Sequence, residues 1–521
     1  MEKFDPIELE LFKNIFISIS EEMAAVLGRT ALSPNIKERK DFSCALFNQK
    51  GETFAQGSHI PVHLGAMPLS VQAALGAVRF DKGDLVVLND PYRGGTHLPD
   101  ITCISPVFVD KRLAFFVANR AHHSDVGGMT PGSMPLATEI FQEGVIIPPL
   151  KLMKKGKLND DLLSLFLANV RTAQERKGDL LAQMAANEKG KQRLEEVISK
   201  YGLKKIIRYT HLIQQYTEKI LRETIREIPD GKYSYADYLD DDGIRNEPVK
   251  IGVEITIKGN EALIDFSSSS PQVEGGVNAN FAVTYSAVLY VFRSLIEEDI
   301  PFNTGLMKPL KINAPQGLVV NALYPAATAG GNVETSQRIV DTLLGALSQA
   351  IPQRIPAASS GTMNNIAFGG YDPVRKTNFA YYETIGGGMG ASFEYPGLSG
   401  VHTHMTNSLN TPLEALENYL PLRIKRYCLR KGSGGDGEKK GGEGIIREYQ
   451  FFVPTQVTII SERRKFSPYG LWGGKGGAKG KNILFSKGKR IILSSKVNMK
   501  VEPGDVLRIE TPGGGGYGQR K

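Results

Sequence analysis

The sequence predicts a multi-domain α/β protein of the mixed α+β kind. The chain has 521 residues, which is too long for one ordinary hydrophobic core. Strand-like runs fill its first third, helical periodicity follows, and strand patterns then return. We therefore predict four parts: a first domain over 1–157, a helical segment over 158–228, an α/β domain over 229–430 and a Gly-rich β part over 431–521.

The first domain is expected to open with a helix over residues 6–31. An aspartate can cap this helix, a proline follows at its first position, and apolar residues recur at helical spacing. Residues 41–57 predict a hairpin, because two apolar runs flank a Gly-containing turn. Residues 83–91 and 113–123 are the clearest strands, and both end in polar residues. Functional groups often lie at such strand ends.

The rest of the chain changes character twice. Residues 158–228 predict two or three helices, and 249–270 alternate like strands around a Gly-Asn turn. Residues 278–296 and 332–351 are predicted to be buried helices. Beyond residue 430 the chain is rich in glycine and strand-like, which is typical of loops joining short strands.

The composition excludes several classes of function. The net charge of +8 is modest and spread out, so we expect a solvated basic face rather than a nucleic-acid groove. No apolar run approaches the roughly 18 residues of a membrane span, and the N-terminus is acidic and amphipathic, unlike a signal peptide. Three cysteines without a CxxC motif suit a reducing compartment, so we expect a cytoplasmic protein.

The stretch "GGTHLPDITC", residues 94–103, contains the first candidate metal ligands. His97 and Asp100 are three residues apart, so one tight turn can place both side chains on the same side. The two glycines permit unusual backbone conformations, and the proline between the ligands stiffens the turn. The alternative is a turn pair that is only hydrogen-bonded.

A second group of candidates ends the strand over 113–123. His122 and His123 are adjacent, and Asp125 follows closely. Neighbouring residues on a strand point to opposite faces, so only one of these histidines can join the site readily. If the two clearest strands are neighbours in one sheet, their ends could present ligands to one cleft. Two imidazoles and one or two carboxylates suit Zn²⁺, Mn²⁺ or Fe²⁺.

Further residues are weaker candidates for the same pocket. Asp41 directly precedes an apolar strand but lies among several cations, so a surface ion pair is the alternative. His59 and His63 could line the pocket. The Asn/Thr-rich stretches over 329–337 and 404–412 are candidate substrate- or interface-facing loops, although turns and caps would explain them equally.

Nucleotide and nucleophile motifs are missing. No stretch matches G-x-x-x-x-G-K-[ST] or G-x-S-x-G, and "ETIGGGMGAS" continues into a proline where a dinucleotide fold needs a helix. No catalytic Cys/His pair stands out. The residues therefore indicate a metal site without a nucleotide site.

Several long motifs resemble those of the hydantoinase B/oxoprolinase family. They include "NDPYRGGTHLPDITCISPVF", "RAHHSDVGGMTPGSMP", "AATAGGNVETSQRIVD", "HTHMTNSLNTPLEALE" and the ending "TPGGGGYG", in order over nearly the whole chain. The resemblance implies a B-type subunit that works in a hetero-oligomer with a hydantoinase A-type partner carrying ATP-Mg. It also implies a metal bound by Asp41, His97, Asp100 and His122, with His122 chosen over His123.

The resemblance implies an ATP-dependent amidohydrolase acting on cyclic amides such as hydantoins, 5-oxoproline and lactams. The partner would phosphorylate the substrate, and the metal in this chain would activate water. His123 or Asp125 is then a hypothetical catalytic residue that orients or deprotonates the water. The alternatives are a subunit of an acetone or acetophenone carboxylase, a non-catalytic scaffold for the ATPase, and a stand-alone metallohydrolase.

Overall fold

The N-terminal third of the chain forms a seven-stranded antiparallel sheet. The computed structural model describes residues 5–520, and its strand order here is β2-β1-β5-β4-β3-β6-β7. The strands are β1 (Phe42–Asn48), β2 (Thr53–Gln56), β3 (Leu85–Leu88), β4 (Asp100–Val109), β5 (Arg112–His122), β6 (Leu150–Lys154) and β7 (Lys157–Leu158). The predicted hairpin is β1–β2, which pairs antiparallel.

The predicted strands over 83–91 and 113–123 are β3 and β5, but they are not neighbours. β4 lies between them and pairs antiparallel with both. A tight turn after Val109 joins β4 to β5, so residues close in sequence pair first. The turn that carries His97 therefore leads into β4, a strand separate from the two predicted ones.

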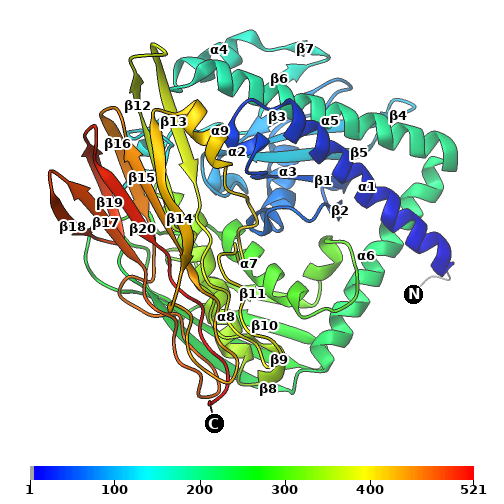
Figure 1. Ribbon diagram of the computed structural model, residues 1–521. Helices are drawn as coiled ribbons and strands as arrows, with labels where there is room; N and C mark the ends of the chain where they lie inside the picture. Colours follow the sequence, from blue (N-terminus) through cyan, green and yellow to red (C-terminus); the bar gives the residue numbers. More distant parts are fainter. Residues whose placement is uncertain (1–4, 521) are drawn as a thin grey trace.

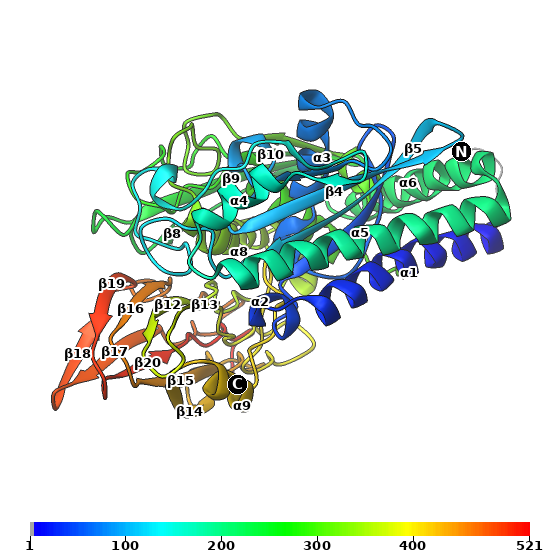
Figure 2. The same ribbon diagram turned by 90° about the horizontal axis from the view of Figure 1, so that it is seen from above.

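Helices cover both faces of this sheet. α1 (Pro6–Thr30) and α5 (Ala173–Tyr201) lie side by side along one face, as Figure 2 shows. α3 (Ala66–Ala77) packs its apolar residues against the opposite face. α1 begins as predicted, because the Asp5 carboxylate accepts a hydrogen bond from the Ile7 N–H at the capped end. The sheet is thus fixed from both sides.

The predicted helical segment contains three helices. They are α4 (Asp160–Ala168), α5 and α6 (Leu203–Arg226). The short α2 (Pro34–Lys37) precedes β1. None of the helices within residues 5–520 is long and apolar enough to cross a membrane.

A second layer is built on a four-stranded sheet of order β11-β10-β9-β8. Its strands are β8 (Gly231–Leu239), β9 (Val249–Lys258), β10 (Glu261–Asp265) and β11 (Leu310–Asn313). The two predicted buried helices, α7 (Phe281–Ser294) and α8 (Ser336–Leu347), share its core. A π-helical turn, Gly331–Thr335, leads directly into α8. Such turns are rare and are frequent at functional sites.

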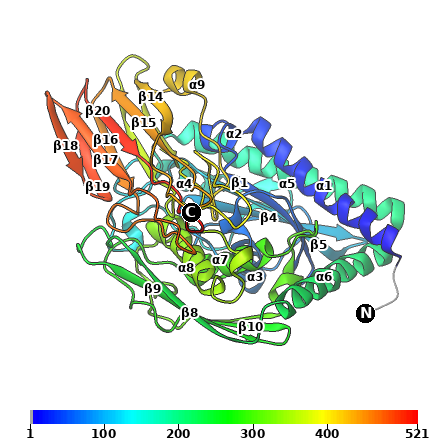
Figure 3. The same ribbon diagram turned by 60° about the horizontal axis from the view of Figure 1, so that its bottom comes forward.

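The last part is a sandwich of two antiparallel sheets, shown as yellow-green to red strands in Figure 1. One has the order β13-β12-β16-β19 and the other β14-β15-β20-β17-β18. Their strands are β12 (Asn365–Asp372), β13 (Thr377–Glu383), β14 (Leu422–Arg430), β15 (Gly444–Phe451), β16 (Thr455–Ile460), β17 (Lys481–Ser486), β18 (Lys489–Leu493), β19 (Lys496–Val501) and β20 (Val506–Glu510). The inner faces share one apolar core, and α9 (Leu413–Tyr419) lies beside β14 (Figure 3).

The α/β, multi-domain prediction is confirmed by these four sheets and their helices. The predicted boundaries at 157, 228 and 430 stay a prediction. Strand pairing crosses the last of them, because β12 precedes residue 430 and pairs with β16 beyond it.

Candidate metal centre

The turn that carries His97 is held rigidly by the residues around it. A short 3₁₀ turn, Pro91–Arg93, ends at Gly94, whose φ of 82° lies in the left-handed region. The Gly94 carbonyl accepts hydrogen bonds from the Ser70 hydroxyl at 2.7 Å and the Arg120 guanidinium at 3.3 Å. A ligand on this turn loses little freedom when an ion binds.

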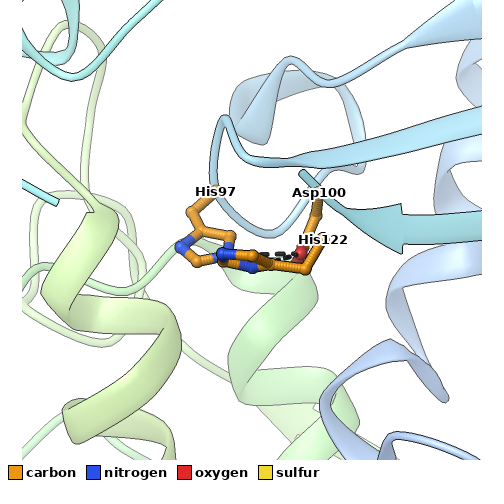
Figure 4. A group of neighbouring side chains, drawn as sticks. All are labelled: His97, Asp100 and His122. Atoms are coloured by element: carbon orange, nitrogen blue, oxygen red, sulfur yellow. Dashed lines mark hydrogen bonds and ion pairs between the residues drawn. The ribbon is translucent and has the colours of Figure 1, made fainter. Parts of the chain in front are cut away.

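Three predicted ligands meet where β4 begins and β5 ends. Asp100 is the first residue of β4, and it lies directly opposite His122, the last residue of β5. Opposite residues on antiparallel strands project their side chains side by side. His97 approaches from the preceding turn, so all three side chains converge (Figure 4).

The donor atoms of these residues form a nearly equilateral triangle. His122 Nδ1 lies 3.1 Å from Asp100 Oδ1, His97 Nε2 lies 3.3 Å from the same oxygen, and the two nitrogens are 3.2 Å apart. Donors about 2.1 Å from one ion, the usual bond length for zinc to nitrogen or oxygen, would lie about this far apart. We refer to His97, Asp100 and His122 as the ligand triangle.

Burial keeps the ligand triangle in a form suited to metal binding. Burial lowers the pKa of His122, so its imidazole is neutral near pH 7. Burial alone would raise the pKa of Asp100, but the surrounding histidines outweigh it and hold that pKa well below its usual range. Neutral imidazoles and an ionised carboxylate are the forms that bind a divalent cation.

The second oxygen of Asp100 is held by two further residues. His63 Nε2 lies 3.3 Å from Asp100 Oδ2, and the Thr96 hydroxyl donates to the same oxygen. His63 Nδ1 in turn lies 2.9 Å from the Ser43 hydroxyl. His63 was expected only to line the pocket, and Thr96 has no signal in the sequence beyond its place beside His97. These groups orient the carboxylate toward the triangle.

Asp41 lies near the ligand triangle but is not one of its members. Its carbonyl accepts from the His122 N–H at 3.0 Å, and its carboxylate lies 3.7 Å from the Arg39 guanidinium. It lines a small cavity together with His63, Asp100 and His122. The sequence-derived alternative for Asp41 was a surface ion pair, but this ion pair is buried.

The small cavity beside the triangle has a volume of about 20 Å³, which is room for a single water-sized group. We call it the inner cavity. Asn332 and Val333 from the stretch over 329–337 line it, as do Met405 and Thr406 from the stretch over 404–412. Both stretches were expected to face a substrate or an interface. Tyr382 of β13 also lines it and stacks on the His122 ring at 4.5 Å between centroids.

His123 and Asp125 point away from the triangle. The His123 Nε2 lies 2.9 Å from Oε1 of Gln183, a residue of α5. Asp125 accepts the N–H groups of Gly127 and Gly132 and pairs with the Arg171 guanidinium at 3.0 Å. As the alternation along β5 requires, consecutive histidines face opposite sides of the sheet. The structure brings neither His123 nor Asp125 to the inner cavity.

His59 lies outside the ligand triangle too. Its ring is 3.6 Å from Glu21 of α1 and accepts from the Cys44 N–H. Cys44 and Cys103 are buried, and burial raises the pKa of both thiols, so they remain protonated. They are inert parts of the core, as their apolar strands indicated.

The family profile that matches this chain describes hydantoinase B/oxoprolinase and covers residues 5–520. The chain belongs to the hydantoinase B/oxoprolinase family. It is 41% identical over 544 aligned residues to 5-oxoprolinase 1 of Arabidopsis thaliana, covering 99% of this chain and 42% of that protein. It thus spans about two fifths of the length of that relative. The B-type subunit of a putative D-/L-hydantoinase from Pseudomonas sp. is 31% identical and is matched over 90% of its length and 99% of this chain.

Solved structures have the same fold. The ATP-dependent caprolactamase of Pseudomonas jessenii matches with a TM-score of 0.93 and 27% identity, covering 99% of this chain and 92% of that one. An acetone carboxylase, from a study of ATP-dependent acetone carboxylation, matches with a TM-score of 0.92 at 18% identity, covering 99% and 76%. This chain is thus a hydantoinase B-type chain by its family and relatives, and it has the fold of these two solved enzymes.

Proposed function

We propose that this chain is the metal-bearing B-type subunit of an ATP-dependent cyclic-amide hydrolase. The observation that carries the proposal is the ligand triangle, buried beside a cavity for one water-sized group. The named relatives act on, or are called after, cyclic amides: 5-oxoproline, hydantoin and caprolactam. A hydantoinase A-type partner would supply ATP-Mg, in a hetero-oligomer.

In this proposal the partner phosphorylates the substrate, and this chain holds the metal. A cyclic amide resists water at neutral pH, and phosphorylation of its oxygen on the partner makes the ring carbon electrophilic. A divalent ion in the triangle would supply Lewis acidity that makes water a nucleophile near neutral pH. Residues of this chain would hold that ion: His97 and His122 through ring nitrogens, and Asp100 through a carboxylate that His63 contacts.

The donor set leaves coordination positions open. Three protein ligands suit Zn²⁺, Mn²⁺ or Fe²⁺ and leave room for water. Asp41, which lines the inner cavity, is proposed as the fourth ligand, which requires its carboxylate to turn from Arg39 toward the triangle. His123 and Asp125 stay proposed as catalytic residues, with the difference that the structure pairs their side chains with Gln183 and Arg171.

The decisive experiment reconstitutes the chain with its A-type partner, ATP and 5-oxoproline, a hydantoin or caprolactam. We expect ring opening coupled to ATP hydrolysis, and about one equivalent of divalent metal in the purified chain by elemental analysis. His97→Ala and Asp100→Asn should lose both metal and ring opening, while His211→Ala on the exposed face of α6 serves as the control. Full ring opening by metal-free variants would instead support a non-catalytic scaffold. Ring opening without ATP or partner would support a stand-alone metallohydrolase.

A ketone carboxylase is the second candidate, favoured by the shared fold with acetone carboxylase. It predicts ATP hydrolysis that depends on bicarbonate and a ketone such as acetone or acetophenone. If ATP turnover in the reconstituted complex required both, with no lactam opened, the order of the two candidates would reverse.

A further inference from the structure

The inner cavity is too small to hold a substrate. Small-molecule pockets usually measure about 300–1,000 Å³, whereas the inner cavity measures about 20 Å³. If the ligand triangle acts on a cyclic amide, the body of that molecule must lie in an adjoining space.

A second cavity of about 420 Å³ shares a wall with the inner cavity. Thr406 lines both spaces, and Pro61 of the second cavity is flanked by Ile60 and Val62 of the inner one. The wall is fixed where the Val62 N–H donates to the Met405 carbonyl at 3.3 Å. We call this second space the outer pocket.

Hydrogen-bond donors surround the outer pocket, and no carboxylate side chain is among its lining residues. Its polar lining residues are Tyr290, Ser294, Arg354, Ser359, His402, Thr403, His404, Thr406 and Asn407. Apolar groups, including Leu344 and Met389, complete the walls. Such a lining suits an apolar ring that carries an oxyanion.

His404 has a polar neighbour at each of its ring nitrogens. Its backbone has a φ of 58°, a left-handed conformation that few non-glycine residues adopt, with asparagine, aspartate and histidine the commonest among them. Its Nε2 lies 3.5 Å from the Asp341 carboxylate and its Nδ1 lies 3.4 Å from the Tyr290 hydroxyl. Strained backbone of this kind persists where surrounding contacts enforce it, often at binding sites.

The Tyr290 hydroxyl lies at a long 3.4 Å from His404 Nδ1, so its one proton can turn to a ligand in the outer pocket. Asp341 is fully buried and already paired with the Arg463 guanidinium at 2.6 Å. It therefore orients the His404 ring without leaving a net negative charge beside the pocket. Burial raises the pKa of Tyr290 to about 12, so its hydroxyl remains a donor. His402 adds two buried ring nitrogens that make no hydrogen bond of normal geometry.

We propose that the outer pocket binds the oxyanion group of the substrate, either a carboxylate or the phosphoryl group added by the partner. Tyr290 and His404 would hold this group together with Arg354, whose guanidinium also pairs with the Glu227 carboxylate at 2.8 Å. This arrangement places the reacting carbon toward Thr406 and the inner cavity. The assignment of the ligand to the substrate rests on the proposed function. The binding of an oxyanion by these residues does not require metal or partner.

The test is a calorimetric titration of the full chain in a chelator, with three probes. These are 5-oxoproline, which carries a carboxylate, 2-pyrrolidinone, which is the same ring without it, and inorganic phosphate. We expect 5-oxoproline or phosphate to bind at least roughly tenfold more tightly than 2-pyrrolidinone, because a charge-assisted hydrogen bond is worth that factor or more. If only 5-oxoproline binds, the bound group is the substrate carboxylate. If only phosphate binds, the bound group is the phosphoryl group.

Two variants locate the binding. His404→Asn keeps a residue that tolerates the left-handed backbone, and Arg354→Gln removes the guanidinium; each should weaken oxyanion binding roughly tenfold or more. His211→Asn is the matched control and should bind as the unmodified chain does. If His404→Asn unfolds, judged by circular dichroism, the partly exposed Arg354 carries the test. The proposal is overturned if neither oxyanion binds, or if both bind equally well to these variants.

This result is separable from the proposed function. If oxyanions bind but the reconstituted complex opens no ring, the outer pocket remains a binding site and the proposed hydrolase function is rejected. If the complex opens the ring, no oxyanion binds and KM is unchanged in both variants, the hydrolase function stands and the outer-pocket proposal is rejected.

Discussion

At the scale of single residues, the orientation of Asp100 depends on a side chain that is not a member of the ligand triangle. The His63 ring lies between the Ser43 hydroxyl and Oδ2 of Asp100, and it contacts both. Residues that orient metal ligands typically contribute about 10–100-fold to metal affinity. We therefore expect His63 to be a positioning residue.

The first prediction concerns His63→Ala. Zn²⁺ affinity, measured by competition with a chelator, should fall about 10–100-fold because Asp100 loses its orientation. Ser43→Ala should have a smaller effect, since it acts only through His63. If His63→Ala has lower thermal stability but unchanged zinc affinity, His63 has only a structural role.

The second prediction concerns pH and His402. Burial, followed by the nearby Arg39 charge, lowers the pKa of His402 to about 4. The folded protein thus favours the neutral ring, whereas the unfolded chain takes up a proton near pH 6.5. The contribution of this ring to stability is complete above pH 6.5 and is lost as the pH falls toward 4. It amounts to no more than about 3 kcal/mol.

Melting temperatures measured from pH 7 to pH 4 check this sign. His402→Gln should show a shallower decrease over that range, because one fewer proton is taken up on unfolding. His211→Gln should follow the unmodified chain. A decrease that is equally steep in His402→Gln would contradict the prediction.

At the scale of elements, the turn between β3 and β4 determines where His97 lies. A Cβ atom added to Gly94 would lie 2.4 Å from the Leu69 carbonyl carbon and 2.5 Å from the Ser70 nitrogen, both in α3. The packing of α3 under the sheet therefore fixes the ligand turn. The register of β4 with β5 then sets Asp100 opposite His122.

The third prediction compares two glycines, Gly94 and Gly156, whose φ angles of 82° and 81° are nearly equal. Gly94→Ala should destabilise the protein by more than about 2 kcal/mol and lower its metal content, because the turn must move. Gly156 has a φ of 81° and open space where a Cβ would lie. Gly156→Ala should cost only about 1 kcal/mol and leave the metal content unchanged. Equal melting temperatures for the two variants would show that packing around Gly94 is unimportant.

At the scale of the whole molecule, the sandwich and the α/β layers depend on each other. The Arg463 guanidinium pairs with Asp237 of β8 and Asp341 of α8 at 2.7 and 2.6 Å. Lys496 of β19 pairs at 3.5 Å with Asp241, which follows β8, and both are buried. Removing one side of such a buried network leaves charges without partners, which is costly.

The fourth prediction is that a fragment ending at residue 430 will not fold alone. It lacks β16 and β19, so β12 keeps β13 but loses its other neighbour β16, and Asp237 and Asp341 lose Arg463. Circular dichroism should show no cooperative thermal transition, and co-expression of residues 431–521 should restore one. A soluble fragment with a cooperative transition would show instead that the boundary predicted at residue 430 separates independent domains.

The sequence by itself predicted the local elements and the family. The N-terminal helix, the β1–β2 hairpin, the helical segment and the two buried helices follow from caps, turns and periodicity, which act between residues close in the chain. The spacing of His97 and Asp100 likewise indicated a ligand pair. Motif resemblance supplied the family, which the comparisons confirm.

Only the tertiary structure decided which predicted residues meet. β4 separates the two predicted strands, and its register places Asp100 opposite His122 while His123 faces Gln183 of α5. The contacts of Asp41, His63 and Thr406 with the inner cavity join segments hundreds of residues apart. Such contacts arise from packing between sheets and helices, and periodicity along the chain contains no information about them.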